Sequence, residues 1–259
     1  MKKALSVILA VFLAGLFAGC AGVVAGSGKQ VTEAYDFAGF TRLEVGSTFE
    51  LVVTRSASYS VSVTADDNLF QYIEVSQDGE TLKIGLKSII RLGPATLKAQ
   101  VGMPLIRGLE LSGASKGTLS GFSSQEEMDI TVSGASSLEL VDMTTGDLKL
   151  DVSGASRLNG SAAGGDADFE VSGASIVQLE GSAGNLVADA SGASRIMLAA
   201  FTVANADVTL SGASSGTVNI RVGGRLDADL SGASRLEYIG EQINLGSIHK
   251  SGASTLSKK

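Results

Sequence analysis

The tetrapeptide Ser-Gly-Ala-Ser occurs eight times in this chain, and its regular spacing restricts the fold more than any other feature. The copies begin at Ser112, Ser133, Ser153, Ser172, Ser191, Ser211, Ser231 and Ser251. The successive intervals are 21, 20, 19, 19, 20, 20 and 20 residues. Self-similarity at a fixed period of this length indicates a repeat architecture, in which each unit packs on its neighbours.

Each copy follows a short segment in which apolar and polar residues alternate. Apolar side chains stand one, three and five places before the first Ser, as in Val152, Leu150 and Leu148, and polar residues such as Asp151 stand between them. Alternation with period two indicates a β-strand with one buried face, and no helical period competes with it. Because the pattern recurs once per 20 residues, and not at hairpin spacing, we predict an all-β solenoid with one coil per repeat.

The composition of the tetrapeptide fits a sharp bend in each coil. Gly permits backbone conformations that are closed to other residues, and Ala and Ser are small enough to fill a corner. A Ser hydroxyl can also hydrogen-bond to the backbone or to the next Ser in a stack. The predicted fold is a right-handed parallel β-helix of about 20-residue coils, since parallel crossovers strongly prefer the right hand.

The first 19 residues have the form of a secretory signal peptide. Lys2 and Lys3 precede an apolar run from Ala4 to Ala18, which is too short to span a bilayer as a helix. The run ends in "LFAGC", which resembles a bacterial lipobox, and Cys20 is the only cysteine of the chain. This resemblance implies that Cys20 is lipidated and anchors the mature protein. An ordinary secreted protein with a chance cysteine is the alternative.

The remaining chain divides into three parts. Residues 20–36 are expected to be the lipidated cysteine and a flexible tether. Residues 37–110 lack the tetrapeptide but alternate like strands, and Asp78-Gly79 is a strong hairpin signal. We predict a less regular β region over 37–110, followed by the Ser-Gly-Ala-Ser β-helix over 111–259.

Composition argues against two classes of function. The net charge is -7 and the basic residues are scattered, whereas nucleic acid requires a basic stripe, so no nucleic-acid partner is expected. The repeated serines lack a general base, because His249 is the only histidine and nothing places it beside a Ser. We therefore predict no catalytic residue, no cofactor, no metal ligand and no enzymatic activity.

A slower rhythm of charge is superimposed on the repeat. Every other coil carries a basic residue four places after the first Ser: Lys116, Arg157, Arg195 and Arg235. The same coils carry an acid two places before that Ser: Glu110, Asp151, Asp189 and Asp229. We interpret these charges as a solvated face. Asp151, Glu170 and Asp189 could stack on successive coils, which leaves a cation bound by their oxygen atoms as an alternative.

The segment "FAGFTRLEVGSTFELVVTRSASYSVSVTADDNLFQYIEVSQDGETLKIGL" is followed by repeated Val-Ser-Gly-(Ala/Ser) coils. In this order the two features resemble the putative auto-transporter adhesin head GIN domain family, DUF2807, over residues 37–240. The resemblance implies an exported or lipid-anchored bacterial envelope protein with a right-handed β-helix. It brings no catalytic residues with it.

Together these features predict a non-enzymatic, lipid-anchored envelope protein that presents a rigid β-helical surface in an adhesive or structural role. The expected location is the outer membrane, facing the periplasm or the cell exterior. The expected partners are the membrane, through the lipid, and an envelope or extracellular polymer or protein. The alternative is a carbohydrate-active β-helix enzyme or a polysaccharide-binding protein, which rests on fold analogy. An ice-binding solenoid is disfavoured because the Ser residues fall at a corner.

Overall fold

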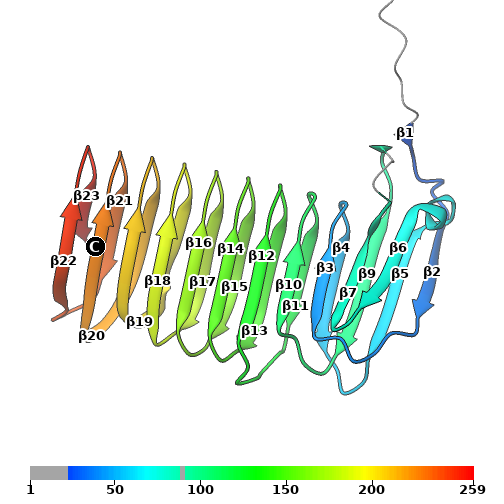
Figure 1. Cartoon of the computed structure of the whole chain (residues 1–259), viewed down its shortest axis with the longest axis horizontal. Coiled ribbons are helices and arrows are strands. Elements are labelled where there is room, and N and C mark those ends of the chain that lie inside the picture. The colour runs from blue at the N-terminus through cyan, green and yellow to red at the C-terminus, as the bar shows by residue number, and fades with distance from the viewer. Residues whose placement is uncertain (1–22, 88–90) are drawn as a thin grey trace, which may run out of the picture.

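The computed structural model describes residues 23–87 and 91–259 as an elongated stack of β-strands (Figure 1). Its one helix is the short 3-10 helix η1 (Asp67–Tyr72). The N-terminal strands are β1 (Val23–Val24), β2 (Gln30–Tyr35), β3 (Arg42–Val45), β4 (Glu50–Arg55), β5 (Ser60–Asp66), β6 (Ile73–Asp78), β7 (Thr81–Leu86), β8 (Arg91–Leu92) and β9 (Leu97–Met103).

The strands of the repeat region are β10 (Gly108–Leu111), β11 (Lys116–Ser120), β12 (Met128–Val132), β13 (Ser137–Thr144), β14 (Leu148–Val152), β15 (Arg157–Ala163), β16 (Ala167–Val171), β17 (Ile176–Ser182), β18 (Asn185–Ala190), β19 (Arg195–Leu210), β20 (Ser215–Leu230), β21 (Arg235–Ile239), β22 (Asn244–Lys250) and β23 (Thr255–Lys258). Within the described part of the chain, no helix is long and apolar enough to cross a membrane.

Every strand of the repeat region pairs in parallel with the equivalent strand one coil away. Sheet 1 contains β3, β10, β12, β14, β16, β18, the second halves of β19 and β20, and β22. Sheet 2 contains β4, β11, β13, β15, β17, the first halves of β19 and β20, β21 and β23.

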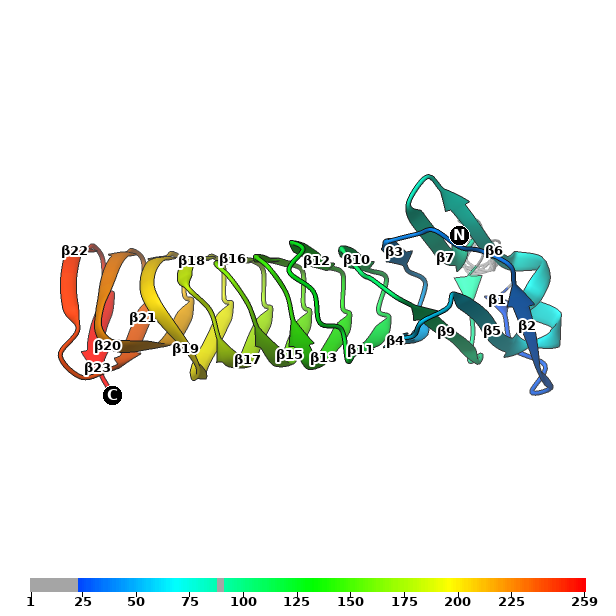
Figure 2. The same cartoon turned by 90° about the horizontal axis from the view of Figure 1, so that it is seen from below.

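The chain runs up sheet 1 and down sheet 2 while it advances along the long axis. Figures 1 and 2 together show this path as a right-handed coil. Equivalent residues stack in register, as in Val132, Val152 and Val171. The predicted right-handed parallel β-helix with coils of about 20 residues is therefore confirmed.

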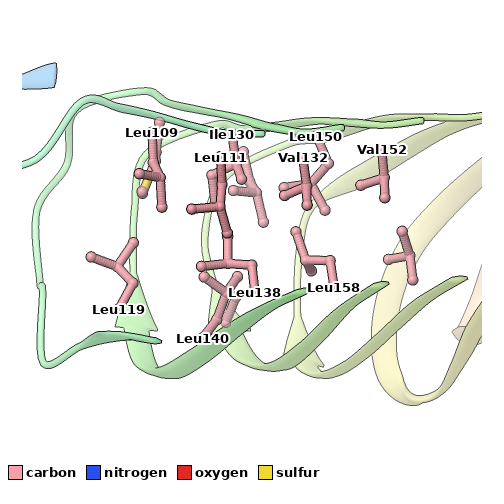
Figure 3. Packing of buried hydrophobic residues seen from close by; sticks show 14 of the residues in the cluster. Leu109, Leu111, Leu119, Ile130, Val132, Leu138, Leu140, Leu150, Val152 and Leu158 are labelled. Carbon is pink, nitrogen blue, oxygen red and sulfur yellow. The ribbon is translucent and has the colours of Figure 1, made fainter. Parts of the chain in front are cut away.

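The space between the two sheets is filled mainly by aliphatic side chains, which Figure 3 shows for strands β10 to β15. Ile130 and Val132 of β12 face Leu138 and Leu140 of β13, and all four are at most 1% exposed. Burial of one such side chain stabilises the fold by about 1.5–3 kcal/mol. Since their neighbours in each strand point outward, the period-two alternation read from the sequence corresponds to the two faces of each sheet.

The N-terminal β region extends the stack and closes one end of it. β3 and β4 pair in parallel with β10 and β11, so residues 42–55 form a further coil that lacks the tetrapeptide. β7 and β9 add one more parallel layer, and the antiparallel strands β6, β5 and β2 follow. Gly79, with φ of 57°, lies in the predicted hairpin between β6 and β7.

Part of the segment expected to be a flexible tether is held against this region. β1 pairs with β8, and β2 pairs along its whole length with β5. The backbone N–H groups of Gly28 and Thr96 donate to the carboxylate of Asp66 over 2.9 and 2.8 Å, and Asp66 is only 3% exposed. A buried carboxylate needs such donors, so Asp66 fixes the segment to the fold.

The tetrapeptide forms the corner between sheet 1 and sheet 2, as predicted. Its Gly has φ between 67° and 77° in all eight copies. In the six copies from Ala155 onward, the following Ala donates its N–H to the carbonyl oxygen of the Gly one coil before, for example Ala174 to Gly154 over 2.8 Å. A Cβ atom on Gly154 would collide with the carbonyl oxygen of Gly134. Gly is thus required both by its backbone conformation and by the close approach of two coils.

We predict that Gly154→Ala lowers the free energy of unfolding by more than about 3 kcal/mol. The left-handed conformation alone costs an L residue about 1–2 kcal/mol, and the collision with Gly134 forces two coils apart in addition. Gly121→Ala is the matched control, because the φ of Gly121 is 75° but nothing lies within 4 Å of the position that an added Cβ atom would take. Urea unfolding curves measure both effects. Equal losses at Gly154 and Gly121 would contradict the collision.

Candidate interaction surfaces

Two columns of outward-pointing side chains run along sheet 1. The first contains Glu44, Glu110, Thr131, Asp151, Glu170, Asp189, Thr209, Asp229 and His249. The second contains Arg42, Gly108, Asp129, Lys149, Asp168, Val187, Asp207 and Asp227. We call these two columns the acidic face. Neighbouring members lie about 4.8 Å apart along the stack. The predicted stacking of Asp151, Glu170 and Asp189 is confirmed.

Only some carboxylates of the acidic face are neutralised by a neighbouring cation. Arg42 pairs with Asp129 over 2.8 Å, and Lys83 pairs with Glu44 over 2.9 Å. Near the other end, a hydrogen bond from Arg225 lowers the pKa of Asp227 to about 2, with help from the backbone N–H of Ser247. Seven acids have no ion pair with any described residue: Glu110, Asp151, Asp168, Glu170, Asp189, Asp207 and Asp229.

The acidic face presents its carboxylates in rows and does not gather them around a point. Among residues 23–87 and 91–259, no group of three His, Cys, Asp or Glu side chains converges as a cation site requires. Asp151, Glu170 and Asp189 stand on adjacent parallel strands and project side by side from a sheet. The arrangement creates a field of negative charge along several coils.

Sheet 2 carries a column of the opposite charge. Its outward residues in register are Glu50, Lys116, Ser137, Arg157, Ile176, Arg195, Ser215, Arg235 and Thr255. We call the cations Lys116, Arg157, Arg195 and Arg235 the basic column. All four are exposed, and none forms an ion pair within the described part of the chain. They recur at two-coil intervals of about 10 Å, which confirms the rhythm read from the sequence.

A ladder of Asp and Asn side chains holds the turn that enters sheet 1. The backbone N–H of Asp166 donates to Asp147 over 2.9 Å, that of Asn185 donates to Asp166 over 2.7 Å, and the Asn205 amide donates to Asn185 over 2.8 Å. The bonds from Asn185 lower the pKa of Asp166. Sequence reasoning missed this ladder, although its members recur at the same 19- and 20-residue intervals as the tetrapeptide. Its role is to hold the turn.

The two serines of each tetrapeptide differ in exposure, since the first is half-buried or exposed and the second is buried in the copies from Ser115 to Ser234. The second Ser of each copy from Ser115 to Ser234 points into the solenoid and is at most 2% exposed. Ser194 and Ser214, for example, donate their hydroxyls to backbone carbonyls of neighbouring coils. His249 is exposed on β22, in register with Asp229. The imidazole of His249 therefore cannot act as a general base on these buried hydroxyls.

An open depression of about 540 Å³ lies where the N-terminal β region meets the repeats. Residues 54–57 line it together with Pro104, Ser120 and Gly121. Arg55 is its only charged residue, and no carboxylate or histidine accompanies it. This hollow therefore lacks the acid and base pair that general acid–base catalysis requires.

Comparison with known proteins agrees with this architecture. Residues 39–241 match the family described as putative auto-transporter adhesin, head GIN domain. The chain belongs to this family. The resemblance recognised in the sequence is thereby confirmed. No match was found among curated proteins.

Several crystal structures share the fold. A putative adhesin from Parabacteroides merdae is 18% identical, with a TM-score of 0.82. A putative lipid binding protein from Parabacteroides distasonis is 20% identical with a TM-score of 0.78, and a putative adhesin from the same organism is 18% identical with a TM-score of 0.80. Each comparison covers 92% of this chain and 100% of the other. At these identities the likeness shows a common fold.

We predict that Glu170→Gln stabilises the protein at low ionic strength. Glu170 is flanked in register by Asp151 and Asp189, and like charges directly opposite each other destabilise a sheet by about 0.2–1 kcal/mol. The gain should shrink when salt screens the charges. Glu180→Gln is the control, because the neighbours of Glu180 are Ser161 and Ala200. Urea midpoints report both, and a lower midpoint for Glu170→Gln would mean that a favourable partner holds this carboxylate.

Proposed function

We propose that this protein is a non-enzymatic adhesin of the bacterial cell envelope, which binds its partner through the lateral surfaces of a rigid rod. The observation that carries the proposal is the set of in-register columns of exposed side chains that continue over successive coils of both sheets. An extended periodic surface suits a polymer or a large protein, because many weak contacts can form at once. Membership of a family described as adhesins supports the same role.

A carbohydrate-active enzyme fits these surfaces less well. Catalysis requires unlike groups that converge on one reacting bond. The acidic face projects its carboxylates side by side from a sheet, and among the described residues no three of them converge on one point. A single coil that carries such chemistry would interrupt the repeat, and the coils from Ser112 onward keep the same corner.

In this proposal Cys20 is lipidated and holds the protein at the outer membrane. Cys20 lies outside the described residues, as does the signal peptide. Only residues 21 and 22 separate Cys20 from β1, which is paired with β8 in the N-terminal β region. This region forms one end of the rod, and the C-terminus lies at the other end (Figure 2). The anchored rod would thus present its repeat coils beyond an N-terminal end that is kept close to the lipid surface.

The anchor is tested by Cys20→Ser in the full chain. We expect the variant to leave the membrane fraction or to accumulate as an uncleaved precursor, because no thiol remains to accept a lipid. Fractionation and mass spectrometry of the mature N-terminus measure the two outcomes. An unmodified Cys20 at the mature wild-type N-terminus would contradict the anchor and would leave the adhesive role standing.

The adhesive role is tested by deleting residues 153–190, which removes two coils between the equivalent positions Ser153 and Ser191. The rod should shorten by about 10 Å and keep its register. Binding to cells or matrix should fall only in part, because part of an extended surface is lost. Circular dichroism controls for folding. Complete loss of binding by a folded variant would place adhesion in one local site, and a glycan-cleaving activity abolished by one Asp or Glu substitution would support the enzyme instead.

A further inference from the structure

The acidic face and the basic column lie on opposite sides of the rod. Sheet 1 carries the acidic face along one edge of Figure 2, and sheet 2 carries the basic column along the other edge. Seven acids on one side and four cations on the other lack ion-pair partners among the described residues. Each surface therefore remains electrostatically unsatisfied within one copy of the chain.

The two surfaces also share one repeat distance, because the same coils produce both. Asp151, Glu170 and Asp189 recur at every coil, while Arg157 and Arg195 recur at every second coil. A second copy shifted sideways, without rotation, would bring its basic column over the acidic face of the first. Each cation of the second copy then lies opposite acids of the first. Because both surfaces repeat with the coil spacing, this match continues along the stack.

We propose that these two surfaces bind each other between copies, so that the rods associate side by side and point in the same direction. The partner is a second copy of this chain. Since the two contacting surfaces differ, the contact is heterologous, and a row of rods keeps one free acidic face at one end and one free basic column at the other. The association therefore grows into rows and does not close as a dimer.

The strength of this contact follows from exposed ion pairs. Each such pair contributes about 0–1 kcal/mol in water, and salt weakens it. The net charge of -7 opposes association between free copies. Attachment of all rods to one surface through their N-terminal ends raises their local concentration and gives them a common direction. The rods should thus associate weakly in solution and detectably when tethered.

The test places donor- and acceptor-labelled full-length protein on neutral phosphatidylcholine vesicles. The chains are held by their lipid or, for the Cys20→Ser chain, by an N-terminal affinity tag, so the test does not depend on the proposed anchor. The wild type should show energy transfer above that of randomly distributed rods, and high salt should abolish the excess. Transfer at the random level for the wild type at low salt would overturn the proposal.

Charge reversal gives the decisive comparison. Arg157→Glu, Arg195→Glu and Arg235→Glu combined replace three of the four cations of the basic column by acids, and Asp151→Lys, Glu170→Lys and Asp189→Lys combined give the central coils of the acidic face a row of cations. Each triple variant alone should lose the excess transfer, and an equimolar mixture of the two should regain it. Circular dichroism verifies that both variants fold. Failure of the mixture to regain transfer would overturn the proposed pairing.

A matched control separates local pairing from net charge. Arg55→Glu, Arg91→Glu and Lys250→Glu change the net charge by the same amount as the arginine triple, but these exposed residues lie outside the basic column. This control should keep the wild-type transfer, and its loss would show that general repulsion explains the result. Wild-type transfer that appears only after polyphosphate is added would also overturn the proposal, because the basic column would then bind an anionic polymer.

Discussion

The structure depends on the contact between successive corners, where the N–H of an Ala meets the carbonyl oxygen of a Gly one coil earlier. These bonds measure 2.7–2.9 Å in six consecutive corners from Ala155 to Ala253. No side chain fits between the two backbones, so a residue with a Cβ atom would separate them. The corner therefore sets the register of both sheets, and the register sets every column of side chains along the rod.

The second Ser of the tetrapeptide completes this corner from the inside. In two places the preceding coil donates a backbone N–H to the Ser hydroxyl, from Ser115 to Ser136 and from Ser156 to Ser175. In later coils the hydroxyl donates instead, as from Ser194 to the carbonyl of Val171 over 3.1 Å. A hydroxyl can serve both arrangements because it is donor and acceptor at once. A buried backbone group near the bend is thus satisfied in either case.

The sequence predicted the parts of the fold that depend on local pattern. Alternation gave the buried face of each strand, and the recurring Gly gave the corner, since both follow from the chemistry of single residues. It did not predict that residues 42–55 form an additional coil, because their corner uses Ser47 and Thr48 at φ of 62° and 65° and lacks the tetrapeptide. The pairing of β2 with β5 was also missed, because a mostly exposed edge strand carries little hydrophobic signal.

The register set by the corners also explains why the candidate interaction surfaces are columns of side chains. Inward positions must fill a narrow core and corner positions must remain small, so the outward positions are those at which coils can differ freely. An outward position on one strand is repeated about 4.8 Å further along on the next, and adjacent residues therefore form rows. A row of charges cannot surround a small substrate, but it can contact another long surface at many points. In the proposed adhesive role, the affinity of this rod for its partner would come from the sum of many weak contacts, so the loss of any single contact would weaken binding only slightly.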